Sequence, residues 1–238
     1  MTIEWHNGNI FTSQAQTIVN TVNCVGVMGA GIALEYRLRY PDMYTKYRAL
    51  CEECGLKPGT LWLYRSSGRW ILNFPTKAHW KHPSRREYLH AGLRKFVNTY
   101  QDKGIKSVAF PMLGADRGGI PVNESREIMA EHLSEVAIPV EVYRFQPTAR
   151  DDLFLKFHSW FIKSGRVLLN EKYGVRQRVV QRLQEQMDSG AFTQLNQLAS
   201  VKGIGIRTLE RVFAAAMEEG AAMEEGQGGG SRQGSLDL

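Results

Sequence analysis

Three loops of this chain combine glycine, amide and cationic residues in patterns suited to a phosphorylated ligand. The first lies in residues 18–34, which read I-V-N-T-V-N-C-V-G-V-M-G-A-G-I-A-L. The β-branched start predicts a buried strand, the glycines a turn, and the end a helix that stops at Pro41. A helix N-terminus beside glycines offers backbone N–H groups and a favourable dipole to an anion. An ordinary strand-to-helix connection is the alternative.

Two further loops carry similar chemistry. Residues 73–80 read N-F-P-T-K-A-H-W, and residues 113–120 read L-G-A-D-R-G-G-I. Each follows or completes a predicted strand, and ligands of α/β sheets lie beyond the carboxyl ends of strands. If these strands are parallel, all three loops meet at one edge of the sheet. Two glycine loops at one edge suit a diphosphate.

The elements that must position these loops alternate along residues 1–146. Strands are expected at 2–11, 17–23, 59–64, 70–74, 108–110 and 140–145, and helices at 32–39, 43–54, 84–104 and 122–136. Ser84 and Glu87 are expected to form a capping box at the start of the long third helix. The alternation predicts an α/β fold with a mostly parallel or mixed sheet covered on both faces.

The loop sequences resemble those of macrodomains. V-N-T-V-N-C-V-G-V-M-G-A-G-I-A, F-P-T-K-A-H-W and F-P-M-L-G-x-x-x-G-G are most similar to the DarG-type DNA ADP-ribosyl glycohydrolases, the antitoxin half of the DarT/DarG pair. They are also similar to the terminal ADP-ribose protein glycohydrolases. The resemblance covers about residues 1–145. It implies a three-layer α/β/α macrodomain with a mixed sheet that binds ADP-ribose.

The resemblance implies which residues meet ADP-ribose. Asn9 stands where the family usually has aspartate, and it is expected near the adenine. Its amide oxygen can accept a hydrogen bond from the adenine amino group. Asn23 matches the asparagine that faces the distal ribose. The other expected contacts come from all three loops and the first turn: Ile10, Asn20, Val27, Met28, Gly29, Gly31, Ile32, Thr76, Gly114, Arg117, Gly118, Gly119 and Ile120.

The resemblance assigns catalysis to Lys77. An N-glycosidic bond breaks through an oxocarbenium-like state, and an amine can attack C1″ or position the leaving base and water. A nucleophilic lysine must be neutral, so burial or a nearby cation must lower its pKa. His79, Lys81 and His82 are close enough in sequence to supply such a cation. A solvated lysine or a phosphate anchor is the alternative.

Asp116 departs from the family pattern and is the second candidate catalytic residue. DarG-like chains tend toward L-G-C-G-x-G-G-L, whereas this chain has L-G-A-D-R-G-G-I. The catalytic aspartate of the terminal glycohydrolases aligns with Gly118. Asp116 therefore either points away from the diphosphate, paired with Arg117, or replaces the missing acid from two positions away.

Cations and aromatic side chains follow Lys77 closely. The expected DNA contacts there are His79, Trp80, Lys81, Arg85 and Arg86. Cations can meet phosphates while Trp80 stacks on a base. The alternative is that the cations form only the charged outer face of the helix expected from Ser84.

The composition changes after residue 146. Helices expected at 152–163, 176–187, 192–200 and 207–217 predict a small all-α domain over residues 150–217, and residues 218–238 read as a disordered tail. Residues 198–213 (L-A-S-V-K-G-I-G-I-R-T-L-E-R-V-F) resemble a helix-hairpin-helix motif, whose backbone N–H groups can hold a DNA phosphate. The expected contacts are Lys202, Gly203, Gly205 and Arg207. A tight turn that only packs is the alternative.

The net charge and the cysteine content narrow the possible partners, location and cofactors of the protein. The 238 residues carry a net charge of +6, which favours a polyanionic partner. Three cysteines with no leader and no membrane-spanning apolar run lead us to expect a cytoplasmic protein with no membrane partner. Cys51 and Cys54 form a lone C-x-x-C, and His79, His82 and His90 alternate with cations, so neither a metal nor a cofactor is expected.

Four functions are compatible with these residues. The resemblance favours a hydrolase that removes ADP-ribose from ADP-ribosylated, single-stranded DNA with help from the C-terminal region. The alternatives are a non-catalytic ADP-ribose reader, an antitoxin that binds a partner ADP-ribosyltransferase toxin through residues 150–217, and a hydrolase of mono-ADP-ribosylated protein.

Overall fold

The computed structural model describes residues 2–149 and 151–228, with side chains described as far as residue 220. The chain divides into two compact units, unit 1 (residues 1–149) and unit 2 (residues 150–238). None of the described helices combines the length and apolar character needed to cross a membrane.

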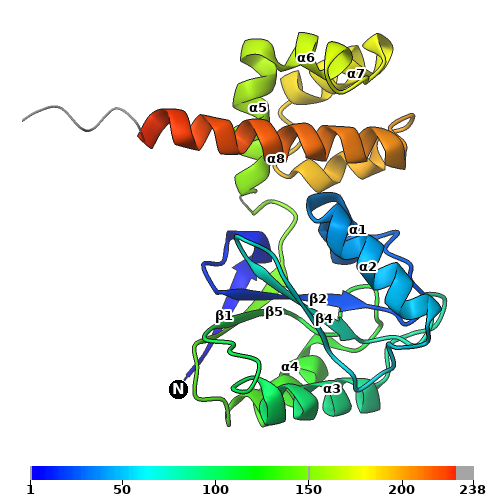
Figure 1. Cartoon of the computed structure of the whole chain (residues 1–238), viewed down its shortest axis with the longest axis vertical. Coiled ribbons are helices and arrows are strands. Elements are labelled where there is room, and N and C mark those ends of the chain that lie inside the picture. Colours follow the sequence, from blue (N-terminus) through cyan, green and yellow to red (C-terminus); the bar gives the residue numbers. More distant parts are fainter. Residues whose placement is uncertain (1, 150, 229–238) are drawn as a thin grey trace, which may run out of the picture. The chain divides into compact units, whose positions relative to one another are not determined.

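A mixed sheet forms the centre of unit 1 (Figure 1). Its strands within the described residues are β1 (Ile3–Gly8), β2 (Thr17–Val22), β3 (Trp62–Arg65), β4 (Trp70–Pro75), β5 (Val108–Pro111) and β6 (Val140–Phe145). Their order is β1-β6-β5-β2-β4-β3, and every neighbouring pair is parallel except β3 with β4. The carboxyl ends of β1, β2, β4, β5 and β6 therefore lie at one edge.

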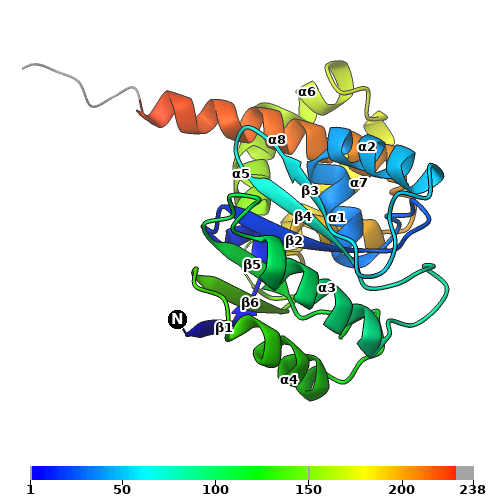
Figure 2. The same ribbon diagram turned by 60° about the horizontal axis from the view of Figure 1, so that its bottom comes forward.

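Helices cover both faces of this sheet. They are α1 (Gly31–Arg39), α2 (Pro41–Glu52), α3 (Arg86–Thr99) and α4 (Val122–Leu133), and a short 3-10 turn, η1 (Ile10–Thr12), follows β1. Figures 1 and 2 show α1 and α2 on one face and α3 and α4 on the other. The predicted three-layer α/β/α fold with a mixed sheet is confirmed.

Alternate residues of β2 pack toward opposite helical layers. Ile18 belongs to the apolar cluster that includes residues of α1 and α2, whereas Val19 belongs to the cluster that includes residues of α3 and α4. Both side chains are fully buried. This two-sided burial explains why the strand is apolar at successive positions instead of alternating with polar residues.

A buried amide pair joins β2 and β4. Asn20 lies directly opposite Asn73, and its Nδ2 donates to Asn73 Oδ1 at 3.0 Å. Neither residue has exposed surface. A slip of one residue between these strands would bury amides without partners, so the pair helps to fix the register of the strands that lead into the first loop and the Lys77 loop.

The start of α3 differs from the prediction. The residue before its first turn is Arg85, without a side-chain cap, so the predicted capping box of Ser84 and Glu87 is wrong. The backbone N–H of Ser84 instead donates to the carbonyl oxygen of Gly118 at 2.9 Å. Tertiary contact between two loops has taken the place of a local cap.

Unit 2 is helical throughout its described elements. These are α5 (Asp152–Trp160), the π-helical segment η2 (Phe161–Gly165), α6 (Arg166–Glu171), α7 (Gln177–Asp188), the 3-10 segment η3 (Leu195–Ser200) and α8 (Ile206–Gly228). The Asp151 carboxylate accepts from Leu153 N at 3.1 Å and from Leu195 N at 2.6 Å. One buried side chain therefore caps α5 and ties it to η3.

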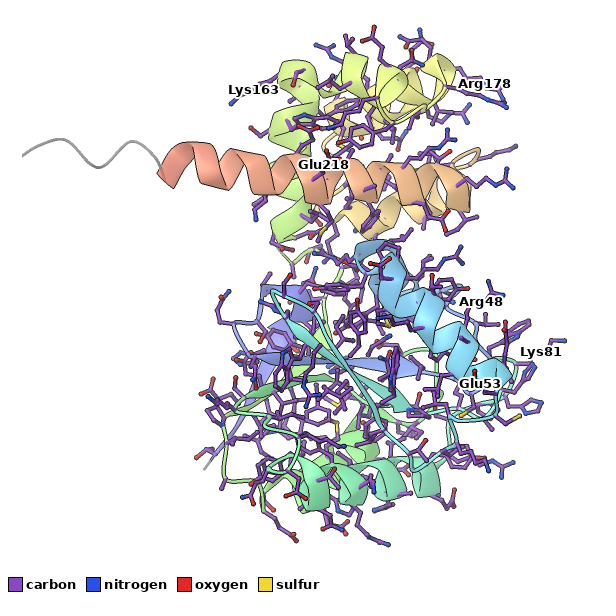
Figure 3. All side chains as sticks on the ribbon, in the orientation of Figure 1. Arg48, Glu53, Lys81, Lys163, Arg178 and Glu218 are labelled. Carbon is purple, nitrogen blue, oxygen red and sulfur yellow. The ribbon has the colours of Figure 1, made fainter. Side chains whose placement is uncertain are left out.

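Helix α8 extends past the residue at which the tail was predicted to begin. Glu218, labelled in Figure 3, and Glu219 accept hydrogen bonds from Lys172 Nζ at 2.7 and 2.8 Å. The repeated A-M-E-E segments are made of strong helix formers, which composition alone misread as disorder. The prediction is wrong for residues 218–228, and residues 229–238 lie outside the described part.

The contact between α3 and the sheet gives a stability prediction. A Cβ atom on Gly92 would overlap the ring of Phe74 in β4. Overpacking of a core costs about 1–3 kcal/mol, and the better helix propensity of alanine returns about 1 kcal/mol. The difference is about 0–2 kcal/mol, and because the Cβ would overlap three atoms of the Phe74 ring, we expect Gly92→Ala to lower the free energy of unfolding by about 1–2 kcal/mol in urea titrations.

Gly68→Ala is the matched control for that experiment. Gly68 lies in the turn between β3 and β4, and nothing would lie within 4 Å of its added Cβ. The free energy of unfolding of Gly68→Ala should stay within about 0.5 kcal/mol of that of the parent protein. Equal stability of the two variants would contradict the packing argument.

Candidate active site

Three loops meet at the carboxyl edge of the parallel strands of unit 1. We call residues 23–30, 76–85 and 112–121 the rim; they follow β2, β4 and β5. Cys24 N donates to Ala78 O at 3.2 Å, which ties the first loop to the second. The bond from Ser84 N to Gly118 O ties the second to the third. The three sequence-predicted loops are thus side by side.

Asn23 holds the first loop in shape. Its Oδ1 accepts hydrogen bonds from Val25 N at 3.0 Å and Val27 N at 3.3 Å, and its Nδ2 donates to Val27 O at 2.5 Å. The hydroxyl of Tyr47, on α2, donates to the Asn23 carbonyl oxygen at 2.7 Å. Both polar atoms of the Asn23 side chain are therefore used by the protein. Sequence reasoning missed Tyr47, which no motif marks.

The first turn of α1 is suited to an anion. Its N-cap residue is Ala30, which supplies no side-chain cap. Gly29, Ala30 and Gly31 are exposed, and Gly31 has a φ of +59°, which glycine adopts without strain. The residues of this turn thus lie at the surface, as binding of an anion by their backbone N–H groups would require.

The Lys77 side chain connects the second and third loops of the rim. Its Nζ donates to the backbone oxygen of Arg117 at 2.5 Å. Desolvation lowers the pKa of Lys77, and the neighbouring Arg117 guanidinium lowers it further. From the sequence, the cation that lowers the pKa of Lys77 was expected to be His79, Lys81 or His82. In the structure, that cation is Arg117.

Asp116 is the neighbour in sequence of Arg117, whose backbone oxygen accepts from the Lys77 amine. Desolvation raises the pKa of the Asp116 carboxyl, and the positive charges of Arg144 and Arg117 act in the opposite direction. No hydrogen bond or ion pair between Asp116 and Lys77 occurs among the described residues. Two arginines thus act on Asp116 electrostatically, but no ion pair with either occurs among the described residues, so both sequence-based alternatives for Asp116 stay predictions.

Asn9 lies at the end of β1, on the expected edge. Its Oδ1 accepts from Phe11 N at 3.0 Å, which caps η1. Its Nδ2 is buried and has no hydrogen-bond partner within the described part of the chain. The predicted acceptor atom is thus engaged locally, and the amide donor is the unsatisfied atom. Ile10, beside it, is buried in the core.

Besides Ile10, three more of the predicted ligand contacts are interior residues. Asn20 and Met28 have no exposed surface, and Thr76 is buried with its N–H donated to Val22 O. The structure does not bring their side chains to the surface of the rim, because they point into the sheet and its helical layer. The remaining predicted contacts of the first and third loops all lie on the rim or the first turn of α1: Val27, Gly29, Gly31, Ile32, Gly114, Arg117, Gly118, Gly119 and Ile120.

Gly118 explains the spacing of the third loop. A Cβ atom there would overlap Gly114 O and the Ser84 hydroxyl oxygen. The Ser84 hydroxyl is buried and has no partner within residues 2–149 and 151–220. This close approach requires glycine at position 118 and leaves the Ser84 hydroxyl oxygen next to the third loop. The glycine pattern of the loop could indicate the role of Gly118 but not that of Ser84.

Cationic and aromatic side chains flank Lys77. Trp80 is 50% exposed and stacks on His79 with ring centroids 5.6 Å apart, and Lys81 Nζ lies 5.2 Å from the Trp80 ring centre. Figure 3 shows Lys81 projecting from the surface of unit 1. Arg85 is exposed, whereas Arg86 forms an ion pair with Glu124. Four of the five predicted contacts are therefore available to a ligand, and Arg86 is engaged.

The predicted hairpin of unit 2 is a tight turn between η3 and α8. Lys202, Gly203, Gly205 and Arg207 are exposed, while Ile204 between them is buried. Arg182 donates to Lys202 O at 2.7 Å and holds the turn. The arrangement presents two glycines and two cations on one surface of unit 2, which fits either a phosphate contact or a packed turn.

Comparison with known proteins agrees with this arrangement. The Macro domain family matches residues 19–129. A DNA ADP-ribosyl glycohydrolase of Thermus aquaticus is 41% identical over 144 residues, which are 59% of this chain and 40% of that protein. The chain therefore spans about two fifths of the length of this curated relative.

Two solved structures share the fold of unit 1. The macrodomain of Thermus aquaticus DarG is 39% identical with a TM-score of 0.56, and the match covers 61% of this chain and 99% of that one. Thermosipho africanus DarTG in complex with ADP-ribose is 34% identical with a TM-score of 0.59, covering 63% of this chain and 43% of that one.

The charge effect of Arg117 on Lys77 gives a prediction. Arg117→Gln removes the guanidinium but keeps the backbone oxygen that accepts from Lys77 Nζ. We expect the pKa of Lys77 to rise toward its ordinary value and to remain below it, because desolvation persists. NMR titration of labelled lysine side chains measures this pKa.

Arg144→Gln is the control for that titration. Arg144 acts on Asp116 and not on Lys77, so its removal should leave the Lys77 pKa unchanged. A Lys77 pKa that responds equally to both substitutions, or to neither, would contradict the assignment.

Proposed function

Since the chain belongs to the macrodomain family, we propose that unit 1 binds ADP-ribose and hydrolyses its bond to a DNA base. One observation carries the catalytic part: the Lys77 amine bridges to the third rim loop and has a lowered pKa. The relative from Thermus aquaticus, named a DNA ADP-ribosyl glycohydrolase, supports the same reaction class.

The rim offers complementary groups for each part of ADP-ribose. The exposed first turn of α1 would bind the diphosphate, and Gly114 and Arg117 would close over it from the other side. The unpartnered Nδ2 of Asn9 would donate to an adenine ring nitrogen, which accepts hydrogen bonds. Asn23 shapes the first loop, so its part is to position backbone groups around the ribose.

Lys77 would act at C1″ of the distal ribose. A lowered pKa increases the neutral fraction of the amine, the form that can attack carbon. As C1″ bonds to Nζ, the bond from C1″ to the base nitrogen breaks and the base leaves with the electron pair, to be protonated. Water then releases ADP-ribose and frees the amine. Positioning of the leaving base and water is the alternative role for the same residue.

The surface beside Lys77 favours single-stranded nucleic acid as the carrier of ADP-ribose. Trp80 is half exposed, stacked on one side by His79 and accompanied by Lys81. An exposed aromatic ring among cations can stack on a base while the cations contact its phosphates. Arg85 continues this positive surface toward α3.

A non-catalytic reader is the second candidate function. It is favoured by Asp116, on which Arg144 and Arg117 act electrostatically and which has no described bond to Lys77. An antitoxin that binds a partner ADP-ribosyltransferase through residues 150–217 stays a prediction from the sequence resemblance. A cytoplasmic location stays a prediction from the cysteine content and the apolar pattern of the sequence.

A cleavage assay separates enzyme from reader. Single-stranded DNA carrying one ADP-ribosylated base is incubated with the parent and with Lys77→Ala. We expect the substitution to slow release at least about a hundredfold, because it removes the group that acts at C1″. Titration of free ADP-ribose should show that both proteins still bind the ligand.

Lys103→Ala is the matched control for the loss of a lysine charge. Lys103 lies in an exposed turn after α3, at the opposite edge of the sheet, and should leave the rate unchanged. Cleavage by Lys77→Ala at the parental rate would exclude the proposed mechanism. Binding without cleavage by the parent would establish the reader.

We further propose that the unit 2 hairpin contacts DNA phosphates without reading sequence. Removing Lys202 and Arg207 together should weaken binding of unmodified single-stranded DNA and reduce the slope of log affinity against log salt by about 1.4. Arg178→Ala with Lys163→Ala, two exposed cations elsewhere on unit 2, is the control (Figure 3). An equal loss in both double variants would indicate general charge attraction only.

A further inference from the structure

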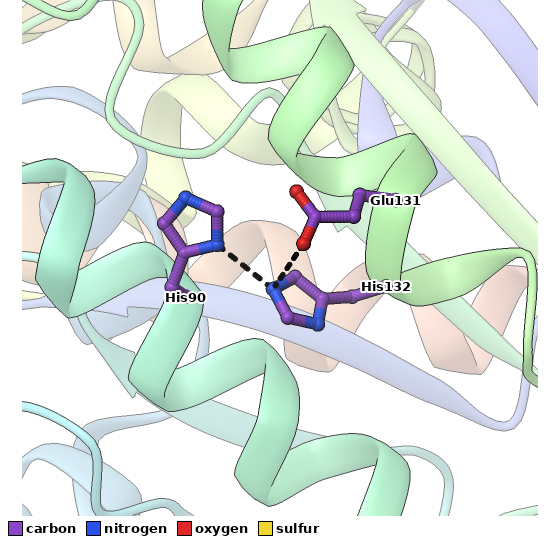
Figure 4. Close-up of side chains that lie close together, drawn as sticks. All are labelled: His90, Glu131 and His132. Carbon is purple, nitrogen blue, oxygen red and sulfur yellow. Dashed lines mark hydrogen bonds and ion pairs between the residues drawn. The ribbon is translucent and has the colours of Figure 1, made fainter.

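Two helices of unit 1 bring three metal-ligating side chains together outside the rim (Figure 4). His90 lies on α3, and Glu131 and His132 lie near the end of α4. One ligand atom from each lies within 4.8 Å of the other two. The proposed glycohydrolase reaction uses none of them.

The spacing of these atoms is close to that of a tetrahedral zinc site. His90 Nδ1 and His132 Nε2 are 2.9 Å apart, and His132 Nε2 and Glu131 Oε1 are 4.0 Å apart. Zinc-to-ligand bonds near 2.0–2.1 Å place neighbouring ligand atoms about 3.3 Å apart. The third pair, His90 and Glu131, lies within 4.8 Å, so the exposed Glu131 carboxylate would have to approach the two rings by up to about 1.5 Å to complete the geometry.

We propose that His90, His132 and Glu131 bind a zinc ion that links α3 to α4, with water as the fourth ligand. Two imidazoles with one carboxylate suit zinc, whereas magnesium and calcium prefer oxygen ligands. In the absence of metal, one ring nitrogen donates to the other. When zinc is bound, each imidazole would direct the lone pair of its ligand nitrogen, His90 Nδ1 or His132 Nε2, to the ion. The proton of each ring would then lie on the other ring nitrogen.

The surroundings of the cluster are compatible with a cation. The charged groups that act on His132 are Glu131, Glu135 and Arg94, so carboxylates outnumber guanidinium groups there. Glu131 and Glu135 supply negative charge. The sequence argument against metal considered the cations near His90 along the chain and could not foresee the ligands that α4 contributes.

The test uses the full chain after treatment with a chelator. Zinc chloride should bind with one-to-one stoichiometry and raise the melting temperature, whereas magnesium chloride should do neither. Cobalt chloride should give the visible absorption of a tetrahedral site. His90→Gln and His132→Gln should each weaken zinc binding by at least about tenfold. Their melting temperatures in the chelator should match the parent's.

His82→Gln is the matched control. His82 is exposed and lies 5.5 Å from His79, measured between ring centres, so these two rim histidines form the competing site. The proposal requires zinc binding to persist in this variant. It is overturned if the parent binds no zinc at protein-equivalent concentration, if both His90→Gln and His132→Gln bind as the parent does, or if His82→Gln abolishes binding.

Discussion

The hydrogen bond from the Lys77 amine to the Arg117 backbone oxygen is the interaction on which the rest of the proposed site depends. It joins two loops that follow different strands, β4 and β5, and it holds the amine beside the guanidinium that lowers its pKa. That geometry requires the strands to be in register. The Asn20–Asn73 pair supplies part of this constraint from inside the sheet.

The prediction from sequence was accurate where the signals are local. Apolar β-branched runs and glycine turns predict the strands, the helical layers and the meeting of three loops at one edge. Residues whose role depends on distant contacts were misassigned or missed. Ser84 was read as a cap although its backbone N–H binds Gly118 O, and nothing in the sequence indicated that Asn20, predicted as a ligand contact, pairs with Asn73 across the sheet. No local pattern could reveal Tyr47 behind Asn23 or the pairing of His90 with His132.

Two of the buried polar atoms without a described partner lie near the edge of the sheet at which the ligand is proposed to bind, whereas others, such as Thr17 Oγ1 and Trp160 Nε1, lie elsewhere. Asn9 Nδ2 and Ser84 Oγ are buried without partners among the described residues, and both lie at or behind residues that follow the strands. Such atoms are costly in a folded protein, and a native structure keeps few of them. Their position at a proposed binding edge fits the general observation that local rules are broken at functional sites.

The pairing of β1 with β6 has a consequence for synthesis. β1 is synthesised before the other strands of unit 1, yet its partner in the described sheet is the last strand of that unit, with Ile3 opposite Val140. A contact of such long range forms slowly, and an unpaired strand edge invites aggregation in the interval. Completion of the sheet must therefore wait until nearly all of unit 1 has been translated, at a time when unit 2 is next to emerge.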